Sequence, residues 1–232
     1  NDLVDFVIAA DGIFSSTKSF FEKKKNEPKY KKALAIRVIL KSKPELNINE
    51  RNISLMMGGN SHIVFYPINN KKELNVVCVI KSKKYNPDSI KTLIKNTILQ
   101  QNPNLKKIFD NEIKSWPLYF TPKIFPSSNK KVFYIGDAFS AFSPTLAQGA
   151  SQSIESAYEL FNLLKNNKLG SGNTYFEERA KKVRIVRKRS NFNLFAFHFT
   201  SLIMQEIRNI FLKFLVKRKT FIEAYLGKVY KN

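Results

Sequence analysis

The sequence predicts an α/β fold, and three observations support this prediction. A strand–turn–helix pattern opens the chain over residues 1–25, and a strand–loop–helix pattern occupies residues 123–172. Between them, residues 30–122 are rich in β-branched and aromatic residues interrupted by turn signals, which is typical of strands. Residues 173–232 carry apolar residues at helical spacing. We therefore expect two α/β segments, a strand-rich α+β insertion between them, and C-terminal helices.

The first α/β segment begins with an apolar strand at residues 4–8 that runs into Asp11-Gly12. Glycine permits a tight turn there, and Ser15 or its neighbours can cap the helix that follows. The free N–H groups at the start of a helix favour an anion such as a pyrophosphate. Taken alone, this short pattern also fits an ordinary turn.

The insertion predicts strands at residues 33–40, 63–66 and 74–80, followed by a helix at residues 88–101. One face of that helix collects four apolar residues, Ile90, Leu93, Ile94 and Ile98. The single cysteine, Cys78, lies in an apolar strand, which argues against a disulfide scaffold and fits a reducing compartment.

Alternation along the strand at residues 62–66 places His62, Val64 and Tyr66 on one face. This face is a candidate binding surface to which Tyr66 supplies a hydroxyl group. The alternative is that both polar rings are satisfied within the fold. Arg37, on the preceding strand, is a candidate partner for a carboxylate, or simply a surface charge.

The second α/β segment is the most informative part of the sequence. An apolar strand at residues 132–135 ends in Gly136-Asp137, at the strand end where open α/β sheets bind ligands. A carboxylate at this position can accept a hydrogen bond from a sugar hydroxyl. Gly149 allows backbone to approach a ligand, and the helix that starts there favours an anion. Six residues of this helix are expected to pack against the sheet: Ala150, Ile154, Ala157, Tyr158, Phe161 and Leu164.

The string Gly-Asp-Ala-x5-Pro-x3-Gln-Gly, from Gly136 to Gly149, resembles the second flavin-binding motif of group A flavoprotein monooxygenases. This is the family of p-hydroxybenzoate and salicylate hydroxylases. Asp11-Gly12 resembles the Asp-Gly motif of the same family. The resemblance implies an FAD cofactor and a Rossmann-like FAD-binding domain formed by residues 1–25 and 123–172. The residues that it assigns to the cofactor are Asp11, Gly12, Gly136, Asp137, Pro144, Gln148, Gly149 and Ala150.

The strand pair at residues 57–67 and 74–77 resembles the substrate-domain hairpin of the salicylate-hydroxylase branch. The resemblance implies that residues 30–122 form the substrate domain and that residues 173–232 form its C-terminal helical region. A small aromatic substrate would then meet Tyr66, His62 and Arg37. Tyr66, His62 and Pro144 are candidates for a catalytic role, the catalytic base is unassigned, and no metal is expected.

The reaction implied by the resemblance begins with reduction of FAD by NADH or NADPH. O2 then adds to the flavin, and the hydroperoxide hydroxylates an electron-rich aromatic ring. Other reactions on this fold stay open: hydroxylation in the ubiquinone pathway, halogenation and prenyl-chain reduction. A basic binding protein that has lost catalysis is the alternative from a different class.

Four positions depart from the family pattern. Lys18 stands where arginine is usual, and serine replaces histidine at Ser140, asparagine at Ser151 and aspartate at Ser156. These replacements bear on the flavin geometry and on reactivity. The family's phosphate-binding G-x-G-x-x-G string does not occur in the sequence. We therefore expect it in a segment preceding Asn1, and we expect the chain by itself to be inactive.

The net charge is +22, from 40 lysine and arginine against 18 acidic residues. Because these charges are spread over every segment, we expect steering of anionic partners but no nucleic-acid partner. No run of about 18 apolar residues predicts a transmembrane span, so a cytoplasmic location is expected. The sequence leaves a homodimer open.

The C-terminal helices have an apolar face with nearby positive charges. The apolar positions are Phe195, Phe199, Ile203, Ile207, Ile210 and Phe214, and the charges are Lys213, Lys217, Arg218 and Lys219. We expect this face to pack against other domains, with peripheral contact to a membrane as the alternative.

Overall fold

The computed structural model describes residues 4–23, 27–41, 52–166 and 173–230. The chain forms two compact units, which we describe one at a time. The first unit comprises residues 1–30, 119–194 and 223–232, and the second comprises residues 31–118 and 195–222. The predicted mixed α/β class with C-terminal helices is confirmed.

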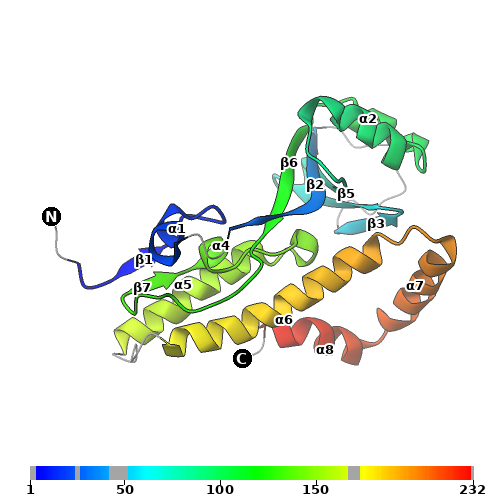
Figure 1. Ribbon diagram of the computed structural model, residues 1–232. Coiled ribbons are helices and arrows are strands. Elements are labelled where there is room, and N and C mark those ends of the chain that lie inside the picture. The colour runs from blue at the N-terminus through cyan, green and yellow to red at the C-terminus, as the bar shows by residue number, and fades with distance from the viewer. Residues whose placement is uncertain (1–3, 24–26, 42–51, 167–172, 231–232) are drawn as a thin grey trace. The chain divides into compact units, whose positions relative to one another are not determined.

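The first unit contains a small parallel sheet. Strand β1 (Val7–Ala9) pairs with β7 (Val132–Tyr134), and Figure 1 shows the two side by side although they are far apart in sequence. The strand predicted at residues 4–8 is therefore shorter and starts later, because its partner β7 has only three residues. The other elements of this unit are α1 (Ser16–Glu22), α4 (Gly136–Phe139), the 3-10 turn η4 (Pro144–Leu146), α5 (Gly149–Lys165), most of α6 (Asn173–Phe197) and the end of α8 (Lys219–Tyr230).

Both faces of β7 contribute to the core of the first unit. Val132 and Tyr134 belong to a buried cluster with residues of β1, α4 and α6, and Phe21 of α1 packs against this cluster. Phe133, on the opposite face, packs with Leu160 of α5 and Tyr175 of α6. Burial on both faces explains why this strand is continuously apolar in the sequence.

The second unit is built on a five-stranded sheet in the order β3-β4-β5-β2-β6. The strand bounds are β2 (Lys29–Leu40), β3 (Ser54–Gly58), β4 (Ser61–Ile68), β5 (Glu73–Lys81) and β6 (Lys114–Phe120). The pairs β3–β4, β4–β5 and β5–β2 are antiparallel. One face of the sheet is largely apolar, and the buried Ser61 lies on the same face. Its buried apolar residues include Leu34, Ile36, Val38, Ile63, Phe65, Val76, Cys78 and Ile80.

The helix predicted at residues 88–101 is present but is not a regular α-helix. It consists of the 3-10 turn η1 (Pro87–Ser89), α2 (Ile90–Ile94) and a π-helical turn, η2 (Lys95–Leu99). Its predicted apolar face is confirmed, since Ile90, Ile94 and Ile98 are buried. The turn η3 (Pro103–Leu105) and α3 (Lys106–Phe109) follow, and α7 (Leu202–Leu215) completes this unit.

The prediction for the packing face of α5 is wrong. The expected apolar face is exposed at Ala150, Ile154, Ala157, Tyr158 and Phe161, and only Leu164 is partly buried. The buried residues are instead Gln152, Ser156 and Leu160. The reason is that α6 presents the polar groups of Tyr175 and Arg179 to α5, and these groups bind polar side chains of that helix.

The apolar face of α7 is also exposed, contrary to the packing that we expected. Ile203, Ile207, Ile210 and Phe214 are each about half or more exposed, whereas Arg208 of the same helix is buried. Arg208 Nη1 donates to the carbonyl groups of Ala196 and Phe197 at 3.1 and 3.4 Å. None of the described helices is both long and apolar enough to cross a membrane.

Candidate functional site

The parallel pairing of β1 and β7 brings two turns to one sheet edge. Asp11-Gly12 follows the end of β1, and Gly136-Asp137 follows the end of β7. Ala9 lies opposite Tyr134, and Ile135 N donates to Ala9 O at 3.0 Å. Parallel strands end at the same edge, so two segments about 125 residues apart in sequence lie at the same edge of the sheet.

Asp11 stabilises the first of these turns. Its carboxylate accepts a hydrogen bond from Thr17 N at 3.0 Å, at the start of α1, while Gly12 adopts a φ of +79°. Ser15 is the N-cap and accepts from Lys18 N at 2.8 Å, which confirms the predicted cap. Burial would raise the pKa of Asp11, but hydrogen bonds from Ser15 and Thr17 outweigh it and lower this pKa to about 2. This carboxylate is therefore charged and already bound to its own chain.

Lys18 joins the two turns. Its ammonium group donates to the carbonyl oxygens of Ala138 and Phe139 in α4 at 2.8 and 3.1 Å. The same group lies 5.2 Å from the centre of the Tyr134 ring. Burial lowers the pKa of Lys18 to about 8, although Glu22 opposes the shift. Sequence reasoning marked Lys18 only as a departure from arginine and missed this contact, because its partners are backbone atoms distant in sequence.

Gly136 must be glycine at the second turn. Its φ is +58°, and a Cβ atom there would lie 2.8 Å from Ser153 Oγ. The next residue, Asp137, is exposed and has no hydrogen-bond donor among the described residues. Desolvation raises the pKa of the Asp137 carboxyl. Asp137 therefore differs from Asp11 in having its acceptor atoms free.

A small cavity lies beside this turn, at the start of α5. Its lining includes Gly136, Asp137, Ser140, Gly149 and Ser153. The Ser140 hydroxyl is buried and has no partner within the described part of the chain. A Cβ atom on Gly149 would meet nothing within 4 Å, so its surroundings are open. Two polar side chains without partners among the described residues, Asp137 and Ser140, thus line a cavity at the start of α5.

The remaining predicted cofactor residues flank this cavity. Pro144 is exposed in η4, and Ala147 closes that turn with a φ of +52°. Gln148 is buried at the N-cap position of α5, and Ala150 is exposed in the first turn of the helix. All the predicted cofactor residues therefore lie within the first unit.

A second group of predicted residues lies on one face of the sheet in the second unit. Asn75 of β5 lies opposite Tyr66 of β4, and Arg37 Nε donates to Asn75 Oδ1 at 2.6 Å. His62 is four residues before Tyr66, so the alternation of the strand places it on the same face. The predicted grouping of Arg37, His62 and Tyr66 is therefore present in the structure.

Some polar atoms on this face have no partner. Asn75 is fully buried, and its Nδ2 atom has no hydrogen-bond partner within residues 52–166 or the other described segments. The partly buried Tyr66 likewise has no hydrogen bond to a described residue. Unpaired buried donors are uncommon in folded proteins and indicate a place for a water molecule or a ligand.

No protein-family model matches the sequence. Among solved structures, the chain is similar to HpxO of Klebsiella pneumoniae in complex with FAD and uric acid. The TM-score is 0.81 at 14% identity, over 97% of this chain and 60% of HpxO. A salicylate hydroxylase in a substrate complex gives a TM-score of 0.71 at 16% identity, over 99% of this chain and 65% of that one. CtdE in complex with FAD and a substrate gives a TM-score of 0.67 at 17% identity, over 84% of this chain and 54% of CtdE.

The chain has the same fold as HpxO and the salicylate hydroxylase. It spans about 60% of the length of HpxO. The resemblance drawn from the two sequence motifs is thereby confirmed at the level of the fold. In this chain, the two motifs that the sequence analysis identified follow β1 and β7 at one edge of the parallel sheet.

Two of the three serine replacements have identifiable surroundings. Ser156 Oγ is 2.7 Å from the Tyr175 hydroxyl, which donates to Tyr134 O at 3.0 Å, and Gly136 N donates to Ser156 Oγ at 3.4 Å. Ser156 thus supports the turn before Asp137. Ser140 lines the cavity, and Ser151 is exposed.

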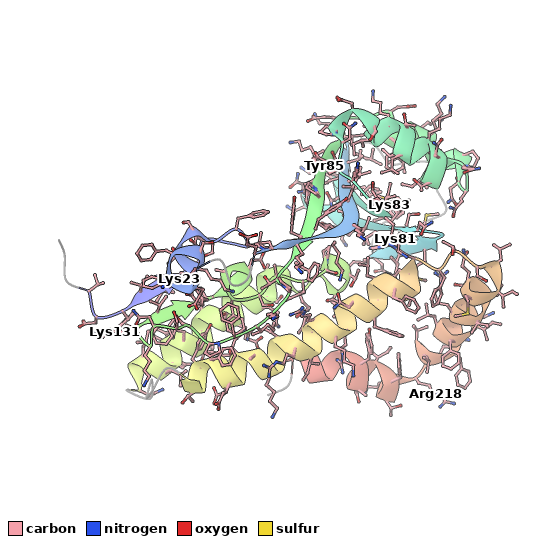
Figure 2. All side chains as sticks on the ribbon, in the orientation of Figure 1. Lys23, Lys81, Lys83, Tyr85, Lys131 and Arg218 are labelled. Atoms are coloured by element: carbon pink, nitrogen blue, oxygen red, sulfur yellow. The ribbon has the colours of Figure 1, made fainter. Side chains whose placement is uncertain are left out.

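Basic side chains occur on several elements of the described chain (Figure 2). The labelled cations in Figure 2 come from separate elements: Lys23 after α1, Lys81 and Lys83 at the end of β5, Lys131 before β7 and Arg218 after α7.

Proposed function

We propose that the protein containing this chain is an FAD- and NAD(P)H-dependent monooxygenase that hydroxylates a small aromatic substrate with O2. The observation that carries the proposal is the parallel pairing of β1 with β7, which brings Asp11-Gly12 and Gly136-Asp137 to one sheet edge. The neighbours solved with FAD have the same fold, which supports FAD as the cofactor.

The residues at this edge fit FAD. Asp137 offers an unpaired carboxylate to a ribityl hydroxyl, and no side chain at Gly149 blocks approach to the backbone. The N–H groups at the start of α5 would face an electron-rich flavin edge. Asp11, already bound to α1, would hold the first turn rather than contact the cofactor directly. When bound, FAD supplies the activation of O2, while the protein supplies position and electrostatics.

The substrate site that we propose is the face with Arg37, His62 and Tyr66. Arg37, the unpaired Asn75 amide and the Tyr66 hydroxyl are all donors, so this face suits a planar ring with oxygen substituents. Uric acid in the HpxO complex is a molecule of this kind. Catalytic participation of Tyr66, His62 or Pro144 is part of the proposal, and the choice of NADH or NADPH is left to experiment.

The proposal extends to partners and location. We infer a cytoplasmic protein, with the exposed apolar residues of α7, next to Lys217, Arg218 and Lys219, as the surface for a membrane or for a second copy in a homodimer. The uniform spread of charge supports no nucleic-acid partner.

The test is oxygen transfer by the flavin-loaded protein. Salicylate and urate are offered as probes with NADH or NADPH under labelled O2, and the products are analysed by mass spectrometry. We expect one labelled oxygen atom in an aromatic product and stimulation of NAD(P)H oxidation by that probe. Flavin binding without any labelled product from these or related aromatic acids would favour another reaction on the fold. Absence of flavin binding would favour the non-catalytic alternative.

A further inference from the structure

His62 and His198 form a buried pair within the second unit. His62 lies in β4, and His198 directly follows the end of α6. Their side chains are almost completely buried, with relative exposures of 3% and 1% for the two residues. His62 Nδ1 and His198 Nε2 are 2.7 Å apart, and the edge of the Phe197 ring packs on His62 at 5.3 Å between centroids. At this distance one of the two nitrogen atoms must carry a proton and the other must accept it.

The surroundings of His198 decide which nitrogen carries the proton. Its other ring nitrogen, Nδ1, is buried and has no partner in the described segments. If that nitrogen were protonated, a buried N–H group would be left without an acceptor, which folded proteins rarely tolerate. If His198 instead carries its proton on Nε2, only a lone pair is left unpaired. The second arrangement is favoured, so His198 donates and His62 Nδ1 accepts.

Both rings are neutral near pH 7. Burial lowers the pKa of His62 to about 4. Burial, together with the nearby His62 and Lys81, lowers the pKa of His198 to about 3. A neutral His62 that accepts at Nδ1 must carry its own proton on Nε2, because a neutral imidazole has one protonated nitrogen.

We propose that His198 is a positioning residue that holds His62 as a neutral Nε2–H donor on the face shared with Tyr66 and Arg37. This inference rests on the proposed function in one respect: the His62 Nε2–H group would donate to an oxygen substituent of the aromatic substrate. His62 Nε2 has no hydrogen-bond partner among the described residues, so its N–H group is available. His62 thereby adds a donor of fixed tautomer to the donors of Arg37, Asn75 and Tyr66 on this face.

Nuclear magnetic resonance tests the proton arrangement without depending on flavin or substrate. The 232-residue sequence contains two histidines, so 15N-histidine labelling of this chain, with His62→Gln and His198→Gln for assignment, reports on both rings whether or not flavin is bound. We expect a proton on His198 Nε2, a proton on His62 Nε2, and a through-hydrogen-bond coupling between His198 Nε2 and His62 Nδ1. A proton on His62 Nδ1, or absence of the coupling, would overturn the inference.

Variants test whether His198 controls His62. His198→Phe keeps a ring but removes the donor, so His62 should become a mixture of tautomers, whereas His198→Gln restores an N–H donor and the single tautomer. Phe197→Leu is the matched control, since it changes packing against His62 but leaves the donor in place. If His62 keeps one tautomer in His198→Phe, His198 is not a positioning residue.

The substrate step is measured separately. With salicylate or urate as the probe, whichever binds the wild-type protein, His198→Phe should raise the dissociation constant about 3- to 10-fold through one poorly oriented hydrogen bond. His198→Gln should recover most of this loss. An unchanged dissociation constant in His198→Phe, alongside the expected tautomer change, would refute the role toward substrate. Absence of binding of every aromatic probe to the wild-type protein would instead count against the proposed function.

Discussion

Asp11 and Asp137 follow neighbouring parallel strands, yet their carboxylates have opposite surroundings. Asp11 accepts hydrogen bonds at the start of α1, and its pKa is lowered to about 2 by Ser15 and Thr17 against the effect of burial. Asp137 has no donor among the described residues, and desolvation raises its pKa. Equivalent positions in the sheet therefore have different tasks: Asp11 maintains the turn, and Asp137 is free to bind a ligand.

This difference predicts distinct results for the two aspartates. Asp137→Ala should raise the dissociation constant of FAD about 10- to 150-fold, because one charged hydrogen bond contributes roughly 1.5–3 kcal/mol. Stability should change little, since no described residue bonds this carboxylate. Flavin fluorescence titration and urea unfolding measure the two quantities. Asp11→Ala is the comparison and should lower stability by about 1 kcal/mol through loss of the α1 contact. Equal flavin affinity in Asp137→Ala and wild type would contradict the assignment.

Tyr66 provides a second prediction at the scale of a residue. Because its hydroxyl has no described partner, Tyr66→Phe should leave bound flavin and stability nearly unchanged. The ratio of hydroxylated product to NAD(P)H consumed should fall, since the substrate loses a donor that orients it. Product and NAD(P)H are measured in the same reaction. A loss of stability with a constant ratio would show that Tyr66 is structural.

At the scale of elements, α5 and α6 associate through a polar network rather than the apolar face expected from sequence. Arg179, which is 1% exposed, donates to Glu155 and Glu159 at 3.2 and 3.1 Å and to Gln152 O at 3.0 Å. Lys182 binds the same two carboxylates. Burial alone would raise the pKa of Glu155, but Lys182 and Arg179 together lower it.

Loss of Arg179 should therefore separate these helices. Breaking a buried ion pair by removing one partner costs about 3–5 kcal/mol, and we expect roughly 2–4 kcal/mol for Arg179→Met because its carboxylate partners are partly exposed. Lys182→Met is the matched control, which should cost under about 1 kcal/mol because Arg179 remains. Urea unfolding gives both values. Similar losses in the two variants would contradict a central role for Arg179.

Helix α7 buries an arginine and leaves its apolar face exposed. Arg208 binds two carbonyl groups at the end of α6, which otherwise lack partners as helix-terminal acceptors. Arg208→Met should lower stability by about 1–3 kcal/mol.

The stability of Ile210→Lys, a change on the exposed face, should stay within about 0.5 kcal/mol of wild type, and this variant should self-associate less. Thermal unfolding measures the stability of the two variants, and light scattering measures self-association. A large loss of stability in Ile210→Lys would show that this face is covered in the native protein.

At the scale of the whole molecule, the buried histidines predict sensitivity to acid. Both pKa values are lowered on folding, from 6.5 to about 4 for His62 and about 3 for His198, chiefly by burial. The unfolded chain therefore binds more protons below pH 6.5, and stability falls as the pH falls from 6.5 toward 4. Two such groups give a slope of about 1–3 kcal/mol per pH unit. Urea unfolding between pH 4.5 and 7 measures how the free energy of unfolding changes with pH.

The control for this pH dependence is a protein without the two imidazoles. In the double variant His62→Gln and His198→Gln, stability should depend much less on pH in the same interval. If the double variant and the wild type show the same slope, other groups dominate acid unfolding.

The sequence by itself determined the α/β class, the two turns and the shared face of His62 and Tyr66. These features depend on short-range rules: apolar runs that end in Asp-Gly or Gly-Asp, glycine at positive φ in Gly12 and Gly136, and alternation along a strand. Such rules act over a few residues, so they can be read without knowing the partners.

Only the tertiary structure decided which groups meet across long separations. It placed the ammonium group of Lys18 on the backbone of α4, paired His62 with His198, and buried the polar side of α5 against Arg179. In each case a polar group is satisfied by an atom about 25 to 140 residues away. Hydrophobic periodicity indicates which faces are apolar, but it carries no information about such partners. For that reason α5 buries Ser156 and exposes Ile154, although its pattern predicts the reverse.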